Sequence, residues 1–436
     1  MDKLLVKLRK AADQGEVYNL ESSSNSVDFQ NGRLHDLESK YQSGYSLRLI
    51  KDGILGSAYT RNLLDENDFI NNALTSMLGK IRAGYDFPLT NKLPSLNTYD
   101  PDIAAVGSDL LVEECHRISA QIKSQTDAEI ELGVIQETSN LNIVNTNSTR
   151  VGSRHSRYIL NVSLIYPGGG TGLDLVLYDK AFRSLEQNLL EELIGMYNFS
   201  QKPVTTTGGP MQVLFLPASI YTLTWRLLSA TSGKNIHEKV SPVAGRTGEL
   251  ILSPLFSLQD DPLNDELPGA RAFDDEGTAT QSLMIYQNGV LQNFYNDLEY
   301  GWKNGTGSSG HGYRAGMWGG DPITLKPSPN LQHLSILPGN KTLSEMIRMM
   351  DRGLILAGVM GAHSGNIPHG DFSVGVSPGI LVEHGKITGR IKDAMVAGNV
   401  YNVLKNIIAI ENRQHPTWGG MFPAILCDKI NVSTKS

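Results

Sequence analysis

The chain has 436 residues, more than one compact core usually holds, so two or three domains are expected. Its formal net charge of −7 argues against a broad nucleic-acid-binding surface, which would carry a basic footprint. Two cysteines, Cys115 and Cys427, exclude a disulfide framework and fall short of a structural zinc cluster. We find no signal-peptide core and no apolar run long enough to span a membrane, which predicts a cytoplasmic protein.

The N-terminal part begins with an amphipathic stripe at 2–13, which predicts a helix. Alternating residues then predict strands with tight turns at Asn31-Gly32 and Asp52-Gly53, because Asn-Gly and Asp-Gly favour hairpins. Helical spacing returns at 66–81, with Asn67 or Asp68 as the expected N-cap. The proline-containing stretch 85–102 has little periodicity and predicts a linker.

The middle part predicts a helix in "DLLVEECHRISAQIKSQ", with Cys115 on its inward face. Short strands are expected at 129–136, 141–146 and 157–165, followed by an amphipathic helix within 180–200.

The C-terminal part opens with an apolar strand at 211–217 and a helix at 218–233 that Gly233 is expected to end. A capping box, Thr342 with Glu345, starts a helix at 342–350, and a last helix is expected at 397–412. Short strands are expected at 248–258, 281–286, 290–296, 354–359, 373–382 and 386–391.

These elements together predict an α+β fold. N-terminal mixed α/β domains precede a C-terminal domain rich in antiparallel β-sheet. We expect an N-terminal domain at 1–88, a middle domain at 103–202 and a C-terminal domain at 203–436.

The dipeptide His237-Glu238 matches the start of the helical zinc-hydrolase signature HExxH. That signature needs a second histidine one helical turn later, and none follows here. Pro242 also prevents the helix from continuing. The pair is therefore expected to lie on the surface.

Other motifs are weaker. The glycine-rich stretches "GSSGHG" and "GGDP" lack the Gly-Lys-Ser/Thr ending of a phosphate-binding loop. His363, His369 and Asp371 form a loose, metal-like cluster in "GAHSGNIPHGDFS", although loop histidines are mostly solvated. A Ser-His-Asp arrangement stays open, but no G-x-S-x-G elbow is present.

Two blocks of the C-terminal half resemble the TldD/PmbA family, historically named modulators of DNA gyrase. The block at 351–410 contains Gly-Asp-Phe-Ser (370–373), the Glu383-x-Gly-Lys-Ile hairpin and Ala397-Gly398-Asn399. The block at 273–316 contains the Phe-Asp-x-Glu-Gly opening and a Thr-Gly…Gly-His…Arg segment. Residues 28–60 resemble the family's first domain more loosely.

The resemblance implies two branches. The TldD branch is similar to a zinc metalloprotease, with HExxxH on the helix after the first C-terminal strand and a later cysteine ligand in Thr-Cys-Gly. The PmbA (TldE) branch lacks these ligands and is the partner subunit of a heterodimer that cleaves partly unfolded peptides and leader segments. In this chain the two histidine positions align with Trp225 and Ala230, the glutamate with Arg226 and the cysteine with Trp418.

The resemblance therefore implies a PmbA/TldE-like pseudoenzyme with no catalytic residue and no metal of its own. Zinc is expected only in a TldD-like partner. Trp225 and Trp418 are expected to fill the volume of the missing metal site. The candidates for a peptide groove lie in loops 305–316 and 361–373; they are His311, Arg314, His363, His369 and Asp371.

Two alternatives remain open. The first is an active metallopeptidase that uses a non-standard site such as His363, His369 and Asp371. The second is a homodimeric peptide-binding protein without a protease partner. Whether the chain is itself an enzyme is left open by the sequence. Direct binding of gyrase, nucleic acid or membrane is not expected.

Overall fold

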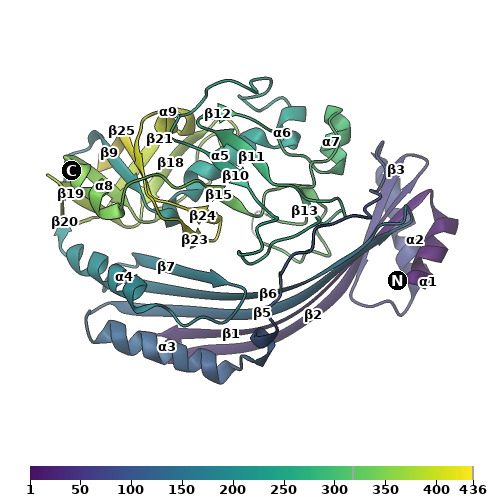
Figure 1. The fold of residues 1–436 in the computed structure, drawn as a ribbon, viewed down its shortest axis with the longest axis horizontal. Helices are drawn as coiled ribbons and strands as arrows, with labels where there is room; N and C mark the ends of the chain where they lie inside the picture. The colour runs from purple at the N-terminus through teal and green to yellow at the C-terminus, as the bar shows by residue number, and fades with distance from the viewer. Residues whose placement is uncertain (317–318, 435–436) are drawn as a thin grey trace.

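The computed structural model describes residues 1–316 and 319–434. Figure 1 shows two layers: a long, curved sheet from the N-terminal half and, above it, a C-terminal unit built around a second sheet. The combination of helices with largely antiparallel sheets confirms the predicted α+β class.

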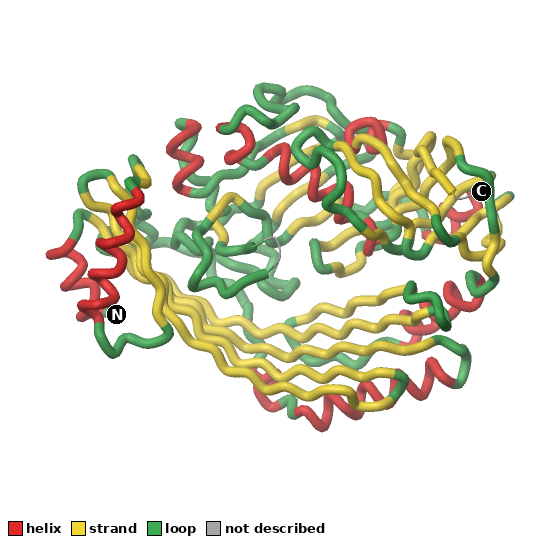
Figure 2. Tube along the Cα trace, turned by 180° about the vertical axis from the view of Figure 1, so that it is seen from behind, coloured by secondary structure: helices red, strands yellow, loops and turns green. Residues whose placement is uncertain are grey.

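The first sheet has seven strands in the order β4-β3-β2-β1-β5-β6-β7. Its four central strands have 16 to 19 residues, far beyond the usual 3–10, so they form an extended ribbon along the molecule (Figures 1 and 2). The strands are β1 (Gln14–Gln30), β2 (Arg33–Lys51), β3 (Ile54–Thr60), β4 (Ile81–Arg82), β5 (Glu129–Asn145), β6 (Arg150–Ile165) and β7 (Gly172–Asp179).

This sheet joins the two N-terminal parts of the chain. Strand β1 pairs antiparallel with β5 from Glu16 opposite Asn145 to Gln30 opposite Glu131. The linker around 85–102 has no helix or strand before a 3₁₀ turn at Pro101–Ala105, and it does not separate two sheets. The units at 1–88 and 103–202 therefore share one continuous hydrogen-bonded layer.

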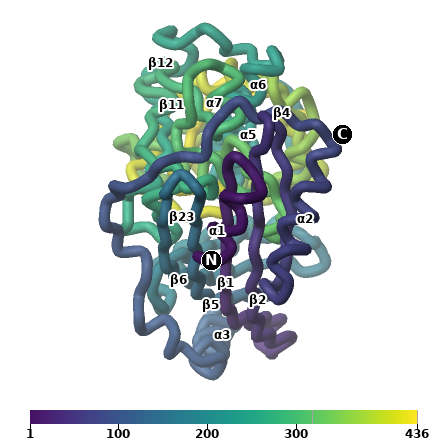
Figure 3. Tube along the Cα trace, turned by 90° about the vertical axis from the view of Figure 1, so that its right-hand side faces the viewer, coloured from purple at the N-terminus to yellow at the C-terminus, as the bar shows by residue number. Residues whose placement is uncertain are grey.

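Helices cover the outer face and the far end of the first sheet. The far end carries α1 (Asp2–Ala11) and α2 (Glu66–Ser76), which bury Leu4, Leu8 and Phe69 against β1 and β2 (Figure 3). The outer face carries α3 (Ser108–Lys123) and α4 (Gln187–Phe199). Even-numbered residues of β6, such as Tyr158 and Leu160, point to these helices. Odd-numbered residues of β6 consequently face the C-terminal unit.

The C-terminal unit contains a ten-stranded mixed sheet in the order β17-β18-β21-β25-β9-β16-β19-β20-β8, with β22 paired to β25. Its strands are β8 (Pro203–Val204), β9 (Gly209–Phe215), β16 (Arg352–Leu356), β17 (Val359–Met360), β18 (Asp371–Val376), β19 (Gly379–Glu383), β20 (Lys386–Ile391), β21 (Ala394–Asn399), β22 (Ile407–Ile410) and β25 (Ile425–Thr434).

A smaller six-stranded sheet lies beside it in the order β12-β11-β10-β15-β24-β23, and a two-stranded ribbon pairs β13 with β14. These strands are β10 (Leu258–Asp260), β11 (Leu283–Gln287), β12 (Val290–Leu291), β13 (Gly312–Tyr313), β14 (Ser328–Pro329), β15 (Leu334–Ile336), β23 (His415–Thr417) and β24 (Gly420–Phe422). The helices are α5 (Tyr221–Thr231), α6 (Gly233–His237), α7 (Leu298–Asn304), α8 (Leu343–Met349) and α9 (Val400–Lys405).

A shared hydrophobic core ties the two layers together at one end. Leu190 of α4 and Leu160 of β6 belong to the same cluster as Ile355 of β16, Val382 of β19 and Leu426 of β25. Since Leu160 points to the outer helices, this core reaches the C-terminal sheet by way of α4, which also contacts β20. None of the helices in residues 1–316 and 319–434 has the length and apolar character needed to cross a membrane.

Several local predictions are confirmed. Asn31, Asp52, Asn288 and His384 adopt positive φ in their hairpin turns, and each precedes a glycine that does the same. Thr342 and Glu345 form the predicted capping box at α8.

Other local predictions are wrong. Asp65, not Asn67 or Asp68, caps α2, because its carboxylate accepts from both of their backbone amides. The expected helix 397–412 is only α9, since the apolar run Ile407–Ile410 pairs with β25 as a strand. The stretch 248–258 is mostly loop, and Gly233 begins α6 instead of simply ending a helix.

Candidate functional site

Helix α5 carries the positions where zinc ligands are implied, and the side chains there are those of a packed interior. Leu223, Leu227 and Ala230 point into the core of the C-terminal unit. Trp225 is half-buried and packs against the same core, as predicted. Trp418 does not: it lies 71% exposed on the β23–β24 hairpin, beside the start of α5. The expectation that two tryptophans fill the metal volume is therefore wrong for Trp418.

Arg226 is the most constrained side chain of this region. It has no exposed surface, and its guanidinium donates four hydrogen bonds to backbone carbonyls. Nε donates to Asp371 O at 2.7 Å, Nη1 to Thr222 O at 2.8 Å, and Nη2 to Ala362 O at 3.0 Å and Ser364 O at 2.8 Å. Burial lowers the pKa of Arg226 to about 10, so the side chain still carries its charge at neutral pH.

The residues at the ligand positions do not fit zinc. Zinc sites are built from thiolate, imidazole and carboxylate groups. Here the four positions hold Trp225, Arg226, Ala230 and Trp418, and a buried cation repels a divalent metal. Within residues 1–316 and 319–434, no three His, Cys, Asp or Glu side chains come together in an arrangement that could hold a metal ion.

Arg226 holds the loop that carries three of the predicted groove residues. His363, His369 and Asp371 are exposed. His369 Nδ1 lies 3.2 Å from Asn366 Oδ1, and Asp371 Oδ1 accepts a hydrogen bond of 2.9 Å from Asn399 Nδ2. The structure thus places His363 and His369 on one solvent-facing loop and Asp371 at the start of β18, which follows that loop.

The other two predicted groove residues are buried. His311 has no exposed surface; its Nδ1 lies 2.9 Å from Ser309 Oγ, and its Nε2 is 3.5 Å from Asp260 Oδ2. In this structure it presents nothing to a peptide. Arg314 is 5% exposed and lines a pocket between the two layers of the molecule.

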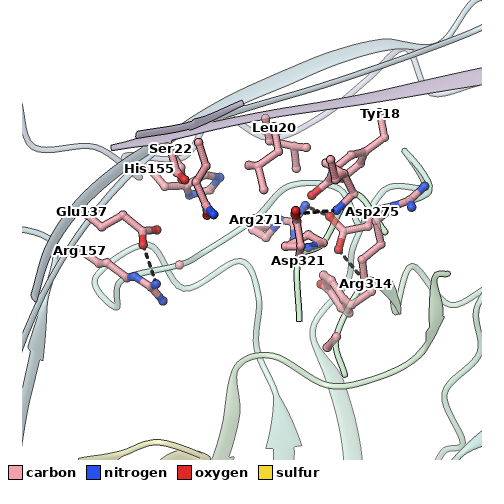
Figure 4. Close-up of a pocket in the computed structure, with 18 of the residues that line it drawn as sticks. Tyr18, Leu20, Ser22, Glu137, His155, Arg157, Arg271, Asp275, Arg314 and Asp321 are labelled. Atoms are coloured by element: carbon pink, nitrogen blue, oxygen red, sulfur yellow. Dashed lines mark hydrogen bonds and ion pairs between the residues drawn. The ribbon is translucent and has the colours of Figure 1, made fainter. Parts of the chain in front are cut away.

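That pocket has a volume of about 450 Å³. One wall is the inner face of the long sheet, which contributes Tyr18, Ser22, Glu137, His155 and Arg157. The opposite wall comes from C-terminal loops, which contribute Arg271, Asp275, Arg314 and Asp321 (Figure 4). Arg61 of the N-terminal half closes one side.

The acidic run Asp274-Asp275-Glu276 builds the C-terminal wall. Asp274 accepts from the backbone amides of Glu276, Thr278 and Gly312, which fixes the turn. Asp275 accepts from Arg271 Nη2 at 2.7 Å and from the backbone amide of Arg314 at 2.8 Å. These bonds fix the backbone that carries both arginines of this wall, Arg271 and Arg314.

Glu276 ties this wall to the long sheet. Its Oε1 accepts from Arg48 Nη1 at 2.7 Å, and Arg48 also forms a two-pronged pair with Glu16 at 2.9 Å. All three side chains are almost fully buried. Burial raises the pKa of Glu16, partly opposed by Arg48. Removing one partner would leave an uncompensated buried charge, which is strongly destabilising.

His155 supplies a polar but uncharged group to the pocket. Its Nε2 lies 2.7 Å from Ser153 Oγ. Burial, helped by the positive charge of Arg271, lowers the pKa of His155 to about 3, so the ring is neutral at physiological pH.

Sequence reasoning identified Arg314 but missed the other pocket arginines. The only available signal was alternation along 150–165, which places His155 and Arg157 on one face of a strand. Nothing local indicated that this face meets residues 271–275.

The fold and this site together define an α+β protein in which helix α5 carries a buried arginine, and the described residues hold no cluster of metal ligands. Residues 208–434, more than half of the chain, match the model of the PmbA/TldA metallopeptidase C-terminal domain, and residues 15–77 match domain 1 of the same family. The chain therefore belongs to the PmbA/TldD family.

Comparisons with individual proteins support this family assignment. An uncharacterised protein of Methanocaldococcus jannaschii is 25% identical over 94% of this chain and 95% of its own length. The metalloprotease PmbA homologue of Haemophilus influenzae is 30% identical over 64% of this chain and 59% of its own. The crystal structure of TldE from Thermococcus kodakarensis has the same fold, with a TM-score of 0.91 and 21% identity over 99% of both chains. Relatives named as TldD homologues also match.

Proposed function

We propose that this chain is the non-catalytic, PmbA/TldE-like subunit of a two-protein metallopeptidase that processes partly unfolded peptides or leader segments. The observation that carries the proposal is Arg226. The family resemblance implies that Arg226 takes the place of the catalytic glutamate, and its buried guanidinium donates three hydrogen bonds to carbonyls of residues 362–371.

The position of Arg226 argues against recreating a zinc site in this chain by a single substitution. A general base must accept a proton from metal-bound water, whereas a guanidinium has donors only. Its removal would leave the carbonyls of Ala362, Ser364 and Asp371 without these donors. The arginine is thus a structural element of this chain.

The partner in this proposal is a TldD-like paralogue that carries HExxxH and the only zinc. The proposal is supported by the match to relatives named both PmbA and TldD homologues and by the likeness in fold to a protein named TldE. A cytoplasmic location is part of the proposal and rests on the two cysteines, which are free and buried.

The test compares the purified chain alone with the chain co-expressed with an HExxxH paralogue from the same genome. Zinc content is measured by atomic absorption and cleavage of an unfolded peptide by mass spectrometry. We expect neither stoichiometric zinc nor cleavage from the chain alone, and both from the complex. A paralogue with Gln in place of the HExxxH glutamate is the matched control and should bind the chain without cleaving.

The outcome that contradicts the proposal is stoichiometric zinc and cleavage by the chain alone. If His369→Ala and a chelator both abolished that activity, the loop at 361–373 would be a non-standard metal site. If no paralogue bound and the chain ran as a dimer in size-exclusion chromatography, it would be a homodimeric peptide-binding protein.

A further inference from the structure

We propose that the pocket between the two layers binds a carboxylate group. Resting on the function proposed above, we assign its occupant as the C-terminal carboxylate of an unfolded peptide. Four arginines line the pocket: Arg61, Arg157, Arg271 and Arg314.

The first argument is an excess of hydrogen-bond donors. Among the buried side-chain atoms without a partner are Arg157 Nε, Arg271 Nε, and both Nε and Nη2 of Arg314. Guanidinium nitrogens donate and never accept, so each of them needs an oxygen. Buried donors are rarely left unpaired, and a cluster of them on one cavity indicates a missing acceptor.

The second argument is that the acidic residues of the pocket are already engaged. Glu137 pairs with Arg157 at 2.8 Å, Asp275 with Arg271 at 2.7 Å, and Asp321 with Arg61. Within residues 1–316 and 319–434, no carboxylate lies within hydrogen-bond distance of the Arg314 guanidinium. Its nearest is Glu16, 3.9 Å from Nη2, and Arg48 already holds both oxygens of Glu16.

Arg314 is therefore the arginine that we assign to bind the carboxylate. Its Nη1 is fixed by Ser46 Oγ at 2.9 Å and Leu325 O at 2.6 Å, and its guanidinium lies 4.5 Å from the ring centre of Tyr18. These contacts orient the side chain, and Nε and Nη2 have no acceptor among the described residues. Two such donors on one guanidinium match the two oxygens of a carboxylate.

The size and the remaining lining favour a peptide end over a bare ion. A volume of about 450 Å³ lies in the range of small-ligand pockets and is much larger than one carboxylate requires. Leu20 and Tyr178, both partly exposed, offer apolar surface, and Ser22 and Ser139 offer hydroxyl groups to a peptide backbone.

The pocket also lies where an extended peptide could run. Tyr178 belongs to β7, and the β23–β24 hairpin that carries the exposed Trp418 lies against the same strand. The pocket and the hairpin therefore share the inner face of the long sheet.

The test is the affinity of the purified full chain for a labelled ten-residue unfolded peptide, measured by fluorescence anisotropy. The same peptide is used with a free C-terminal carboxylate and with a C-terminal amide. We expect the free acid to bind at least ten-fold tighter. Arg314→Gln should remove this preference, and Arg157→Gln should reduce it at least three-fold.

Arg154→Gln is the matched control. Arg154 lies on the same strand as Arg157, but its guanidinium stacks on Tyr99 at 3.6 Å and does not line the pocket. It should keep the full preference. Arg157 is partly exposed, so its variant is expected to fold even if Arg314→Gln does not. Equal binding of acid and amide, or an unchanged preference in Arg157→Gln, overturns the assignment.

Competition separates the sources of the anion. N-acetylglycine should displace the labelled peptide, and inorganic phosphate should not; displacement by phosphate alone overturns the carboxylate assignment. Mass spectrometry of the peptide runs in parallel. Cleavage by the chain alone would refute the function proposed above, whereas a preference for the free acid would still uphold the carboxylate pocket.

Discussion

Replacing Arg226 with leucine removes the guanidinium that ties α5 to the loop at 361–371. Three carbonyls of that loop, those of Ala362, Ser364 and Asp371, then lose a charged donor at 2.7–3.0 Å. Hydrogen bonds from charged groups contribute about 1.5–3 kcal/mol each, which gives roughly 5–9 kcal/mol in gross terms. The variant also avoids the cost of burying the cation, so we expect a net destabilisation of about 3–5 kcal/mol.

The assay is thermal unfolding followed by calorimetry, combined with hydrogen exchange of the loop. For a unit the size of residues 208–434, a loss of about 4 kcal/mol lowers the unfolding midpoint by about 8–16 °C. Amide exchange should also rise in 361–371 before the rest of the sheet opens. Arg226→Lys keeps the charge but not the planar fork, and should fall between wild type and leucine.

Arg348→Leu, at an exposed position on α8, is the control and should change stability by less than about 0.5 kcal/mol. If Arg226→Leu unfolds within 2 °C of wild type with unchanged exchange in 361–371, the guanidinium does not hold the loop. The structural role assigned to Arg226 would then be incorrect.

Three further predictions follow from the buried groups and from one exposed ring. Burial, with the charge of Glu276, raises the pKa of Asp297 from 3.8 to about 8, so the stability it contributes is complete below about pH 4 and is lost as the pH rises to 8. Asp297→Asn keeps an acceptor for the Tyr300 amide but cannot titrate. In denaturant titrations, it should reduce the fall of the unfolding free energy between pH 5 and 8 by up to about 1.4 kcal/mol per pH unit. An unchanged pH dependence of the unfolding free energy would contradict this prediction. Burial raises the pKa of the Cys115 thiol to about 12 and that of Cys427 still further, so neither should react with a thiol reagent until the protein is unfolded in guanidinium; prompt labelling of the native chain would show otherwise. Trp418→Ala should change the free energy of unfolding by less than about 0.5 kcal/mol because the ring is 71% exposed, and a loss of several kcal/mol would restore the core-packing expectation.

Local chemistry made much of the fold predictable. Asn31-Gly32, Asp52-Gly53 and Asn288-Gly289 marked three hairpins, because each needs two residues at positive φ. The capping box formed by Thr342 and Glu345 likewise predicted the start of α8, because it is also a local signal. These signals depend on residues within one turn of each other, so tertiary context does not override them.

The incorrect predictions concern strands that pair with segments distant in the sequence. The run 397–412 has helical spacing, but Ile407–Ile410 gains more by pairing with β25 than by extending α9. No local sequence pattern predicted that the two N-terminal parts join into one sheet, since β1 and β5 pair across more than a hundred residues.

The residues of the candidate site were likewise predictable only where the sequence signal was local. Alignment with the family implied that Arg226 replaces a catalytic glutamate, but its four carbonyl partners appear only in three dimensions. His311 is a histidine in a glycine-rich loop, a setting typical of surface residues, yet the loop folds inward and buries it completely. The pocket arginines come from segments as distant as Arg61 and Arg314, so no local pattern could gather them.

The pairing of β1 with β5 also has a kinetic consequence. Glu16 meets Asn145 only after the chain between them has closed a very long loop, and contacts of that kind form slowly. Until β5 arrives, one edge of β1 and its exposed amides remain open to other chains. We therefore expect refolding of the N-terminal half to be slow and concentration-sensitive, and a cut in the linker at 85–102 to leave two fragments that stay associated through the sheet.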